Sequence, residues 1–334
     1  MTSEVLYCGG SVACVELVSG SMSDITTAGR FNATYGRAAL QIGASSAIRL
    51  RCYSGMTPQS AVDGDTFYCH YSVYFTVASF TATLWEARDS AGFGWLRLTC
   101  DSSEIVRLQY NSGTGAAPVW TTLATSAGSI AQNFQIWDFI VSINSAGTHY
   151  AAFCIGNSVL IEGFWTQALF TNIRECILAS NSTSSIPISE MVMTRNMSTI
   201  NCKVKEIAAS ALGNTNTFSS GTYTDVNEAA NNDATIRSSN AAAQKFTDVF
   251  TDVTTPAGFY IPSLWMWARA KNSGVAPTNL KGVIRRSGVD YPSANMVNMG
   301  VAFANCFARW DADVVSGNWD DAKINGAEFG LESA

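Results

Sequence analysis

The sequence carries little charge for its length. Of its 334 residues, 14% are Asp, Glu, Lys or Arg, compared with about 25% in typical soluble proteins. The formal net charge is -6, and no run of Lys or Arg occurs. Because nucleic-acid binding depends on neutralising phosphates, these absences argue against DNA or RNA as a partner. Ser, Thr, Asn, Gly and Ala replace the charge, which suits a surface that packs against identical or sibling subunits, or faces sugars.

Long hydrophobic runs are also absent. No stretch of about 18 or more uncharged apolar residues occurs, so we expect no membrane insertion. Residues 1–5 do not combine a basic segment with a following apolar stretch. We therefore expect no signal peptide.

Histidine is nearly absent, since His70 and His149 are the two in the chain. The short motifs of zinc proteases, serine hydrolases and P-loop proteins do not occur. His70 follows Cys69, but a Cys/His nucleophile also needs an orienting carboxylate or amide, and the sequence gives no sign of one. This scarcity argues against catalysis.

Paired carboxylates, which glycoside hydrolases need on one face of the site, are missing as well. A strand would present them as alternating acids. The candidate acids instead occur singly, at Glu86, Glu104, Glu162 and Glu190. We expect no enzyme activity.

Metal-binding and cofactor motifs are lacking too. The segment Asp311–Gly317 begins like a calcium loop, but its later ligand and glycine positions are out of step. The Asp63–Asp65 turn is equally generic, so solvated turns are the interpretation of both. We expect no metal and no cofactor.

Cysteine is present but not patterned. No Cys-x-x-Cys pair occurs, which argues against zinc ribbons and redox motifs. Buried free cysteine acts as a small hydrophobe, and we expect this role for most of them, with assembly in a reducing cytoplasm. One or two disulfides are the alternative, with Cys8–Cys14 as the local candidate. The cysteines are Cys8, Cys14, Cys52, Cys69, Cys100, Cys154, Cys176, Cys202 and Cys306.

What the sequence does contain is alternation of apolar and polar residues over short runs, the signature of half-buried strands. Turn clusters rich in Asp, Asn, Ser and Gly separate the runs. This pattern predicts an all-β fold of antiparallel β-sandwich, jelly-roll-like type. The clearest runs are 70–77, 95–100, 104–110, 137–143, 246–250, 264–270 and 280–285.

The composition changes near residue 203, where a stretch of small residues follows, and this change predicts two domains, 1–205 and 206–334. The segment 201–205 looks like the last strand of the first. Residues 1–60 are an arm, a docking strand or part of the first sandwich, and we favour the last, with a strand near the N-terminus pairing with the final one. Residues 227–244 are rich in Ala and Asn and predict a short helix or an extended loop.

Residues 65–204 resemble the concanavalin A-like (laminin-G-like) jelly roll. The resemblance rests on runs that follow one another in the order of such domains. It implies a two-layered antiparallel sandwich closed by the strand near 186–193. The runs are Gly94–Leu98, Ile105–Tyr110, Trp120–Leu123, Trp137–Ile143, Tyr150–Asn157 and Ile186–Met193.

Residues 218–334 resemble the C-terminal part of many tailed-bacteriophage virion proteins. The matching segments are Tyr223–Glu228, Trp267–Ala270 and the terminal run Trp310–Gly330. In that run, Val314 stands where the pattern has proline, and Asp320 where it has threonine. The resemblance implies a tail, fibre, collar or head-surface component without enzyme activity.

Three residues of the run 264–270 form a Trp-x-Trp-x-Arg stripe, namely Trp265, Trp267 and Arg269. Because alternate residues of a strand share a face, the stripe is an intersubunit patch, a sugar-stacking platform or the core face of the second domain. If it is the core face, Leu264 and Met266 contact a neighbour. A further aromatic candidate for glycan contact is Trp165, expected to be exposed.

Together these features predict a structural, non-catalytic virion protein of a tailed phage, assembled in the host cytoplasm. Its expected partners are itself, as a homo-oligomer for which a trimer is plausible, and other virion proteins. The alternative is a glycan-binding module that recognises the host surface. A polysaccharide-degrading enzyme is the third hypothesis.

Overall fold

The computed structural model describes residues 3–10, 14–54, 56–74, 82–131, 133–180, 185–229, 232–272, 274–275, 277–296 and 299–334. The chain divides into two compact units, residues 1–204 (unit 1) and 205–334 (unit 2). Both are built from antiparallel sheets, which confirms the predicted all-β class. No helix among the described residues is long and apolar enough to cross a lipid bilayer.

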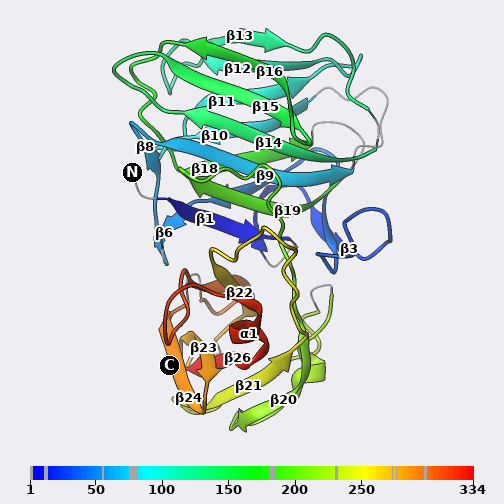
Figure 1. The fold of residues 1–334 in the computed structure, drawn as a ribbon, viewed down its shortest axis with the longest axis vertical. Helices are drawn as coiled ribbons and strands as arrows, with labels where there is room; N and C mark the ends of the chain where they lie inside the picture. Colours follow the sequence, from blue (N-terminus) through cyan, green and yellow to red (C-terminus); the bar gives the residue numbers. More distant parts are fainter. Residues whose placement is uncertain are drawn as a thin grey trace. The chain divides into compact units, whose positions relative to one another are not determined.

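Unit 1 is a sandwich of two large sheets (Figure 1). Sheet A has the order β16-β15-β14-β9-β19-β4-β3, and β1 also pairs with β19. Its strands are β1 (Glu4–Gly9), β3 (Met22–Ile25), β4 (Ala39–Ile42), β9 (Thr66–Tyr74), β14 (Phe134–Ser142), β15 (His149–Ile155), β16 (Ser158–Trp165) and β19 (Ile186–Arg195).

Sheet B faces sheet A and has the order β13-β12-β11-β10-β18-β5-β2. Its strands are β2 (Glu16–Ser19), β5 (Ser46–Arg51), β10 (Ala82–Arg88), β11 (Gly94–Cys100), β12 (Val106–Asn111), β13 (Trp120–Thr125) and β18 (Glu175–Ser180). Two short pairs complete the unit: β6 (Tyr53–Ser54) with β7 (Thr57–Pro58), and β8 (Ala61–Val62) with β17 (Asn172–Ile173).

The core of unit 1 forms because alternate strand residues point to the same side. Tyr71 of β9 and Phe139 of β14 face sheet B, where Phe139 stacks on Trp85 of β10 with ring centroids 4.3 Å apart. All three side chains are buried. The intervening residues, such as His70 and Asp138, therefore lie on the outer face of sheet A, the face turned away from sheet B.

The N-terminal region belongs to the sandwich. β1 pairs with β19, the last strand of unit 1, from Glu4 opposite Arg195 to Gly9 opposite Met191. This pairing confirms that a strand near the N-terminus meets the final one. The expectation of a strand at 201–205 is wrong, because these residues form no strand. Residues 201–204 belong to the connector, residues 196–204, which is held by contacts described below.

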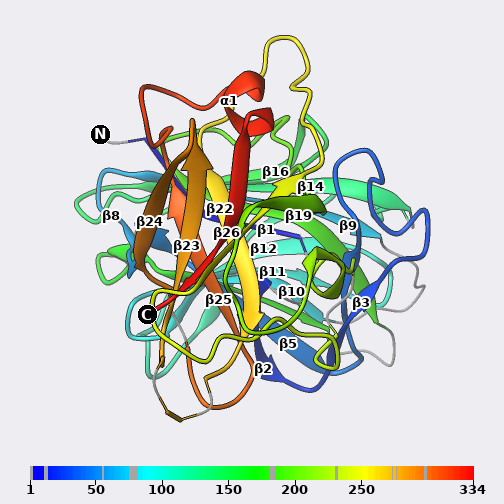
Figure 2. The same ribbon diagram turned by 90° about the horizontal axis from the view of Figure 1, so that it is seen from below.

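Unit 2 has a five-stranded sheet in the order β20-β21-β26-β23-β24 and a two-stranded ribbon of β22 and β25. Figure 2 shows β24, β23 and β26 side by side, with α1 close to the start of β26. The elements are β20 (Ala209–Asn216), the 3-10 helix η2 (Tyr223–Asp225), β21 (Lys245–Phe250), β22 (Leu264–Ala270), β23 (Leu280–Arg286), β24 (Val289–Asn295), β25 (Ala304–Trp310), α1 (Asp321–Asn325) and β26 (Ala327–Ser333).

The core of unit 2 lies between the five-stranded sheet, the ribbon and α1. Its buried members include Ile284 and Phe329 of the sheet, Ile324 of α1 and the loop residue Trp319. Gly282 lets the ribbon approach β23, because a Cβ there would lie 2.7 Å from the Ala308 Cβ. The second layer of this sandwich is therefore a narrow ribbon and one short helix.

The Ala- and Asn-rich segment 227–244 has no helix among its described residues, so the extended-loop alternative holds there. Its anchor is Arg237, which forms two hydrogen bonds with Asp248 of β21, of 2.8 and 3.0 Å. The guanidinium carbon of Arg237 also lies 4.1 Å from the Phe246 ring centroid. One buried side chain thus fixes the loop to the sheet.

Candidate functional site

The Trp-x-Trp-x-Arg stripe lies on one face of β22, and its cross-strand partners on β25 extend it. Trp265 is opposite Arg309, and Trp267 is opposite Phe307. Phe307 stacks with both tryptophans at centroid distances of 5.1 Å, and the Arg309 guanidinium lies 5.2 Å from the Trp265 ring. Both tryptophans are half-buried. The structure thus gathers three aromatic rings and one guanidinium on a single ribbon face.

The core of unit 2 lies on the other face of this ribbon. Leu264 and Met266 pack against the buried cluster around Ile284 and Phe329. The interpretation of the stripe as the core face, with Leu264 and Met266 turned to a neighbour, is therefore wrong. The intersubunit and sugar-platform interpretations of Trp265 and Trp267 stay predictions.

Arg269 extends the stripe but is engaged within the chain. Its guanidinium donates to both carboxylate oxygens of Asp233, at 2.6 and 2.9 Å. The hydrogen bond from Arg269 lowers the pKa of Asp233. Any ligand that binds Arg269 through a carboxylate or phosphate would have to displace Asp233.

Trp165, on β16, does not lie at the surface. It is 4% exposed, so the expectation of exposure is wrong. Its ring packs between His149 and Phe170, with centroids 5.0 and 5.9 Å away. Cross-strand pairing with His149 turns it toward the interior. In this position it offers a glycan no ring face.

His70 has an orienting carboxylate that the sequence did not reveal. Asp138 pairs with His70 across β9 and β14, and its Oδ1 lies 2.9 Å from His70 Nδ1. The same oxygen accepts the Thr199 hydroxyl at 2.7 Å, which fastens the connector to the outer face of sheet A. The sequence signal for this carboxylate was Asp138 itself, the one acidic residue in the largely apolar run Trp137–Ile143.

This buried dyad lacks the rest of a nucleophilic site. His70 and Asp138 are both 0% exposed, and within the described part of the chain His70 Nε2 has no hydrogen-bond partner. Cys69 faces sheet B, on the opposite side of the strand from His70. Burial raises the pKa of the nearby Cys202 thiol well above its usual value, so little thiolate forms. As folded, the dyad holds the connector in place rather than presenting a reactive group.

The acids Glu86, Glu104, Glu162 and Glu190 are not brought together in a pair. Glu162 on β16 and Glu190 on β19 share sheet A but are four strand spacings apart, or about 19 Å. Glycosidase carboxyl pairs lie about 5–9.5 Å apart. Glu86 lies in sheet B, and Glu104 precedes β12 of that sheet. Glu190 is buried and accepts the Ser72 hydroxyl at 2.6 Å.

The terminal run that carries the phage resemblance holds unit 2 together. Trp319 donates its indole N–H to the Trp310 carbonyl at 3.2 Å. Asp320 caps α1 by accepting the Lys323 amide at 2.8 Å. Asn325 bonds both the amide and the carbonyl of Val253, at 2.7 and 2.9 Å. These residues build a loop, a helix start and a strand junction, and not a ligand site.

Two glycines of the terminal run and one of its two substituted positions, Asp320, also serve the structure of unit 2. Gly317 has a φ of +66°, which favours glycine. Gly330 has no room for a side chain, because a Cβ would collide with the Phe246 carbonyl. Asp320 replaces threonine at a helix N-cap, where both residue types are favoured.

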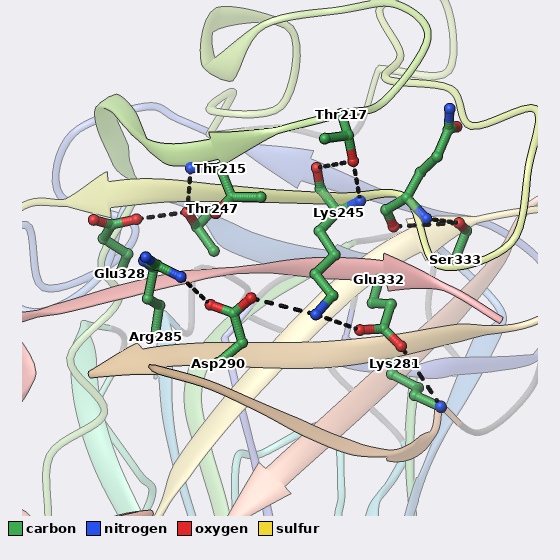
Figure 3. Close-up of polar contacts among 11 residues, drawn as sticks. Thr215, Thr217, Lys245, Thr247, Lys281, Arg285, Asp290, Glu328, Glu332 and Ser333 are labelled. Atoms are coloured by element: carbon green, nitrogen blue, oxygen red, sulfur yellow. Dashed lines mark hydrogen bonds and ion pairs between the residues drawn. The ribbon is translucent and has the colours of Figure 1, made fainter. Parts of the chain in front are cut away.

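The polar face of the five-stranded sheet carries a chain of ion pairs (Figure 3). Lys245 lies between Asp290 and Glu332, at 3.3 and 3.2 Å. Arg285 binds Asp290 at 2.5 Å, and Lys281 binds Glu332 at 3.6 Å. Each cation thus has an acid on a neighbouring strand. Its three cations and two acids largely neutralise one another, with every charge held in an ion pair.

Metal and ligand cavities are not evident where the structure is described. No group of three or more His, Cys, Asp or Glu in the described residues is arranged to hold a metal ion. In the calcium-loop candidate, Asp313 is bound to Arg286 at 2.6 Å. A cavity of ≈ 10 Å³ between the sheets of unit 1, lined by Tyr71 and Trp137 among others, has room for about one water.

None of the nine cysteines is disulfide-bonded, which excludes the Cys8–Cys14 alternative in this structure.

Neither a protein-family model nor a curated protein matches this sequence. Solved structures match at low identity. Endo-β-1,4-glucuronan lyase from the fungus Trichoderma reesei is 11% identical, with a TM-score of 0.40, over 59% of this chain and 97% of that one. The exoplasmic/lumenal domain of VIP36, in a form bound to Ca²⁺ and Man3GlcNAc, is 11% identical with a TM-score of 0.34, over 53% and 82%.

A third match is the sialidase of Trypanosoma rangeli in complex with sialic acid. It is 12% identical with a TM-score of 0.33, over 46% of this chain and 25% of that one. Similarities of this size establish neither a shared activity nor a shared ligand.

Proposed function

We propose that this chain is a structural component of a tailed-phage virion, an oligomeric tail, fibre, collar or capsid-surface protein without catalysis. The observation that carries the proposal is the terminal run Trp310–Gly330. Its resemblance to virion proteins falls on residues that build the fold of unit 2, such as Trp319 and Asn325. The likeness therefore concerns a structural module, which is the part that related virion proteins would share.

The surface chemistry supports assembly with proteins. Charged residues are few, and those on the polar sheet face pair with one another, as Lys245 does with Asp290 and Glu332. Burying such a face in a subunit contact leaves no unpaired charge, which is the main electrostatic cost of association. The expected partners are further copies of this chain and other virion proteins.

The absence of catalysis in this proposal is supported by the geometry of the candidate groups. The His70–Asp138 dyad is buried beneath the connector, and Glu162 is too far from Glu190 to act with it. Virion assembly in the host cytoplasm agrees with nine cysteines that carry no disulfide.

The test is co-purification with particles. Particles of the phage whose genome encodes this chain are purified from a lysate on a density gradient. They are then analysed by quantitative mass spectrometry. The proposal predicts a fixed number of copies per particle that persists through a second gradient. Loss of the chain in the second gradient, with the known coat proteins retained, would contradict it.

A second candidate function is binding of a host-surface glycan, which can coexist with the first. It is favoured by aromatic side chains that are at least partly exposed on sheet faces, including Trp265 and Trp267. Rings held rigidly on a strand can stack on the apolar faces of sugars at low entropic cost. Binding of host-envelope polysaccharide by the intact chain is the expected outcome, and a lack of binding would remove this candidate.

A further inference from the structure

One end of the outer face of sheet A carries an exposed aromatic ring beside an exposed carboxylate. The strands are β15 and β16, where Tyr150 is opposite Phe164 and Ala152 is opposite Glu162. Directly paired residues point to the same face, and the next pair along the strands, Phe153 and Ile161, points to the opposite face and is buried in the core. All four side chains therefore lie on the face turned away from sheet B.

The exposure of these side chains is unusual for their type. Phe164 is 66% exposed, although it lies within a strand, the edge strand β16, rather than in a loop. Its ring is 5.0 Å from that of Tyr150 and tilted by 46°. The small Ala152 separates this pair from Ile140 and Tyr68, which continue the same face on β14 and β9. The surface thus presents apolar ring area at fixed positions.

The carboxylate of Glu162 is oriented beside the rings. Tyr150 donates its hydroxyl to Glu162 Oε2 at 2.5 Å, and burial raises the pKa of Tyr150, which keeps the phenol protonated. No ion pair to Glu162 occurs within the described part of the chain. The exposed glutamate is therefore an acceptor that a ligand with hydrogen-bond donors can reach.

From this arrangement we propose that Tyr150, Glu162 and Phe164 form a binding platform for a neutral sugar chain. This proposal rests on the glycan-binding candidate above and gives it a position and a ligand class. A pyranose has an apolar C–H face that covers Phe164 and Tyr150, and hydroxyl groups that donate to Glu162. The negative charge of Glu162 repels uronic or sialic acids at this point, because no cation accompanies it.

The test measures binding of the intact chain to immobilised polysaccharides by affinity electrophoresis. The probes are four neutral polymers (dextran, laminarin, yeast mannan and arabinogalactan) and one acidic polymer, polygalacturonate. We expect retardation by at least one neutral polymer and none by polygalacturonate. Phe164→Ala weakens binding by about tenfold, equivalent to about 1.4 kcal/mol, and Glu162→Gln weakens it less.

Two further variants locate the effect. Leu169→Ala removes another exposed apolar side chain of unit 1 and is the control, expected to bind like the parent chain. Trp267→Ala removes a ring of the unit 2 stripe, the other candidate position for a bound sugar, and is expected to weaken binding less than Phe164→Ala. If Trp267→Ala abolishes binding and Phe164→Ala does not, the proposed site at Phe164 is wrong, whereas the proposed glycan-binding function is supported. If no neutral polymer binds, or if Phe164→Ala changes only the oligomeric state in light scattering, the patch is not a sugar site.

Discussion

The indole N–H of Trp319 donates to the carbonyl of Trp310 at 3.2 Å, which closes the loop between β25 and α1. Trp319 is 4% exposed and packs with Ile284 and Phe329. One residue thus joins the ribbon, the helix and the five-stranded sheet of unit 2. Because this contact links all layers of the unit, its loss is expected to affect the whole unit rather than one loop.

Trp319→Ala is therefore predicted to destabilise unit 2 by about 3–5 kcal/mol, the range for removing a large buried aromatic side chain. Urea unfolding of the full chain, followed by hydrogen exchange in segments of unit 2, measures this. Val315→Ala in the same loop, where the side chain is exposed, is expected to cost less than about 0.5 kcal/mol. Equal effects of the two variants would refute the central role of Trp319.

Asp320 is predicted to act as an N-cap that threonine can replace. Asp320→Thr restores the residue of the resembled pattern and is expected to change stability by less than about 0.5 kcal/mol, whereas Asp320→Ala costs about 1 kcal/mol. Thermal unfolding of both variants against the parent chain checks this. A large loss with threonine would mean that Asp320 has a role other than accepting the Lys323 amide.

The buried pair of Arg237 and Asp248 predicts a large cost for removing one partner. Arg237→Met leaves Asp248 buried and uncompensated, which costs about 3–5 kcal/mol. A matched control is Arg269→Met, since Arg269 also binds an aspartate through two bonds but is partly exposed. That variant is expected to cost about 0–1 kcal/mol. Similar costs in urea titrations would show that burial of the Arg237 pair does not matter.

Acid is predicted to weaken unit 2 through Glu328. Burial acts to raise the pKa of this carboxyl, but hydrogen bonds from Thr247 and Asn214 outweigh it and lower the pKa below the ordinary value of 4.5. A depressed folded-state pKa adds stability above the unfolded-state value, and this stability disappears as the pH falls through the folded-state value. The loss is therefore expected below a pH of about 4.5.

Glu328→Gln tests this pH dependence. The variant cannot ionise, so it is expected to be less stable than the parent at pH 7 and to lose less stability between pH 5 and pH 3. Urea midpoints at several pH values, followed by hydrogen exchange in segments of unit 2, give the comparison. If both chains lose stability in parallel, Glu328 is not the responsible group.

Much of the strand content could be predicted from the sequence. The run 264–270 coincides with β22, and the runs 95–100 and 280–285 fall within β11 and β23. Alternation succeeds at β11 because its apolar side chains, such as Leu96 and Leu98, are buried and the polar ones between them are less so. Alternation could not show which side of β22 is buried, because both of its faces are apolar. Trp265 and Trp267 were therefore considered for the core face, whereas Leu264 and Met266 are the residues that pack against the core.

The candidate sites depended on contacts between residues distant in sequence, which local patterns do not encode. The pairing of β9 with β14 brings Asp138 to His70, 68 positions away, and the β15–β16 register sets Tyr150 beside Glu162. The sequence did not show that Trp165 is buried. Its burial follows from packing on His149 and Phe170, which only the fold brings near.

The position of the protein on the particle tests the central claim most directly. Immunogold electron microscopy of purified particles, with antibody raised against residues 212–334, is the measurement. The account predicts label at one defined place on a head, collar or tail, and label at distal tips would further favour receptor binding. Unlabelled particles from a lysate in which the protein is abundant would contradict the structural role.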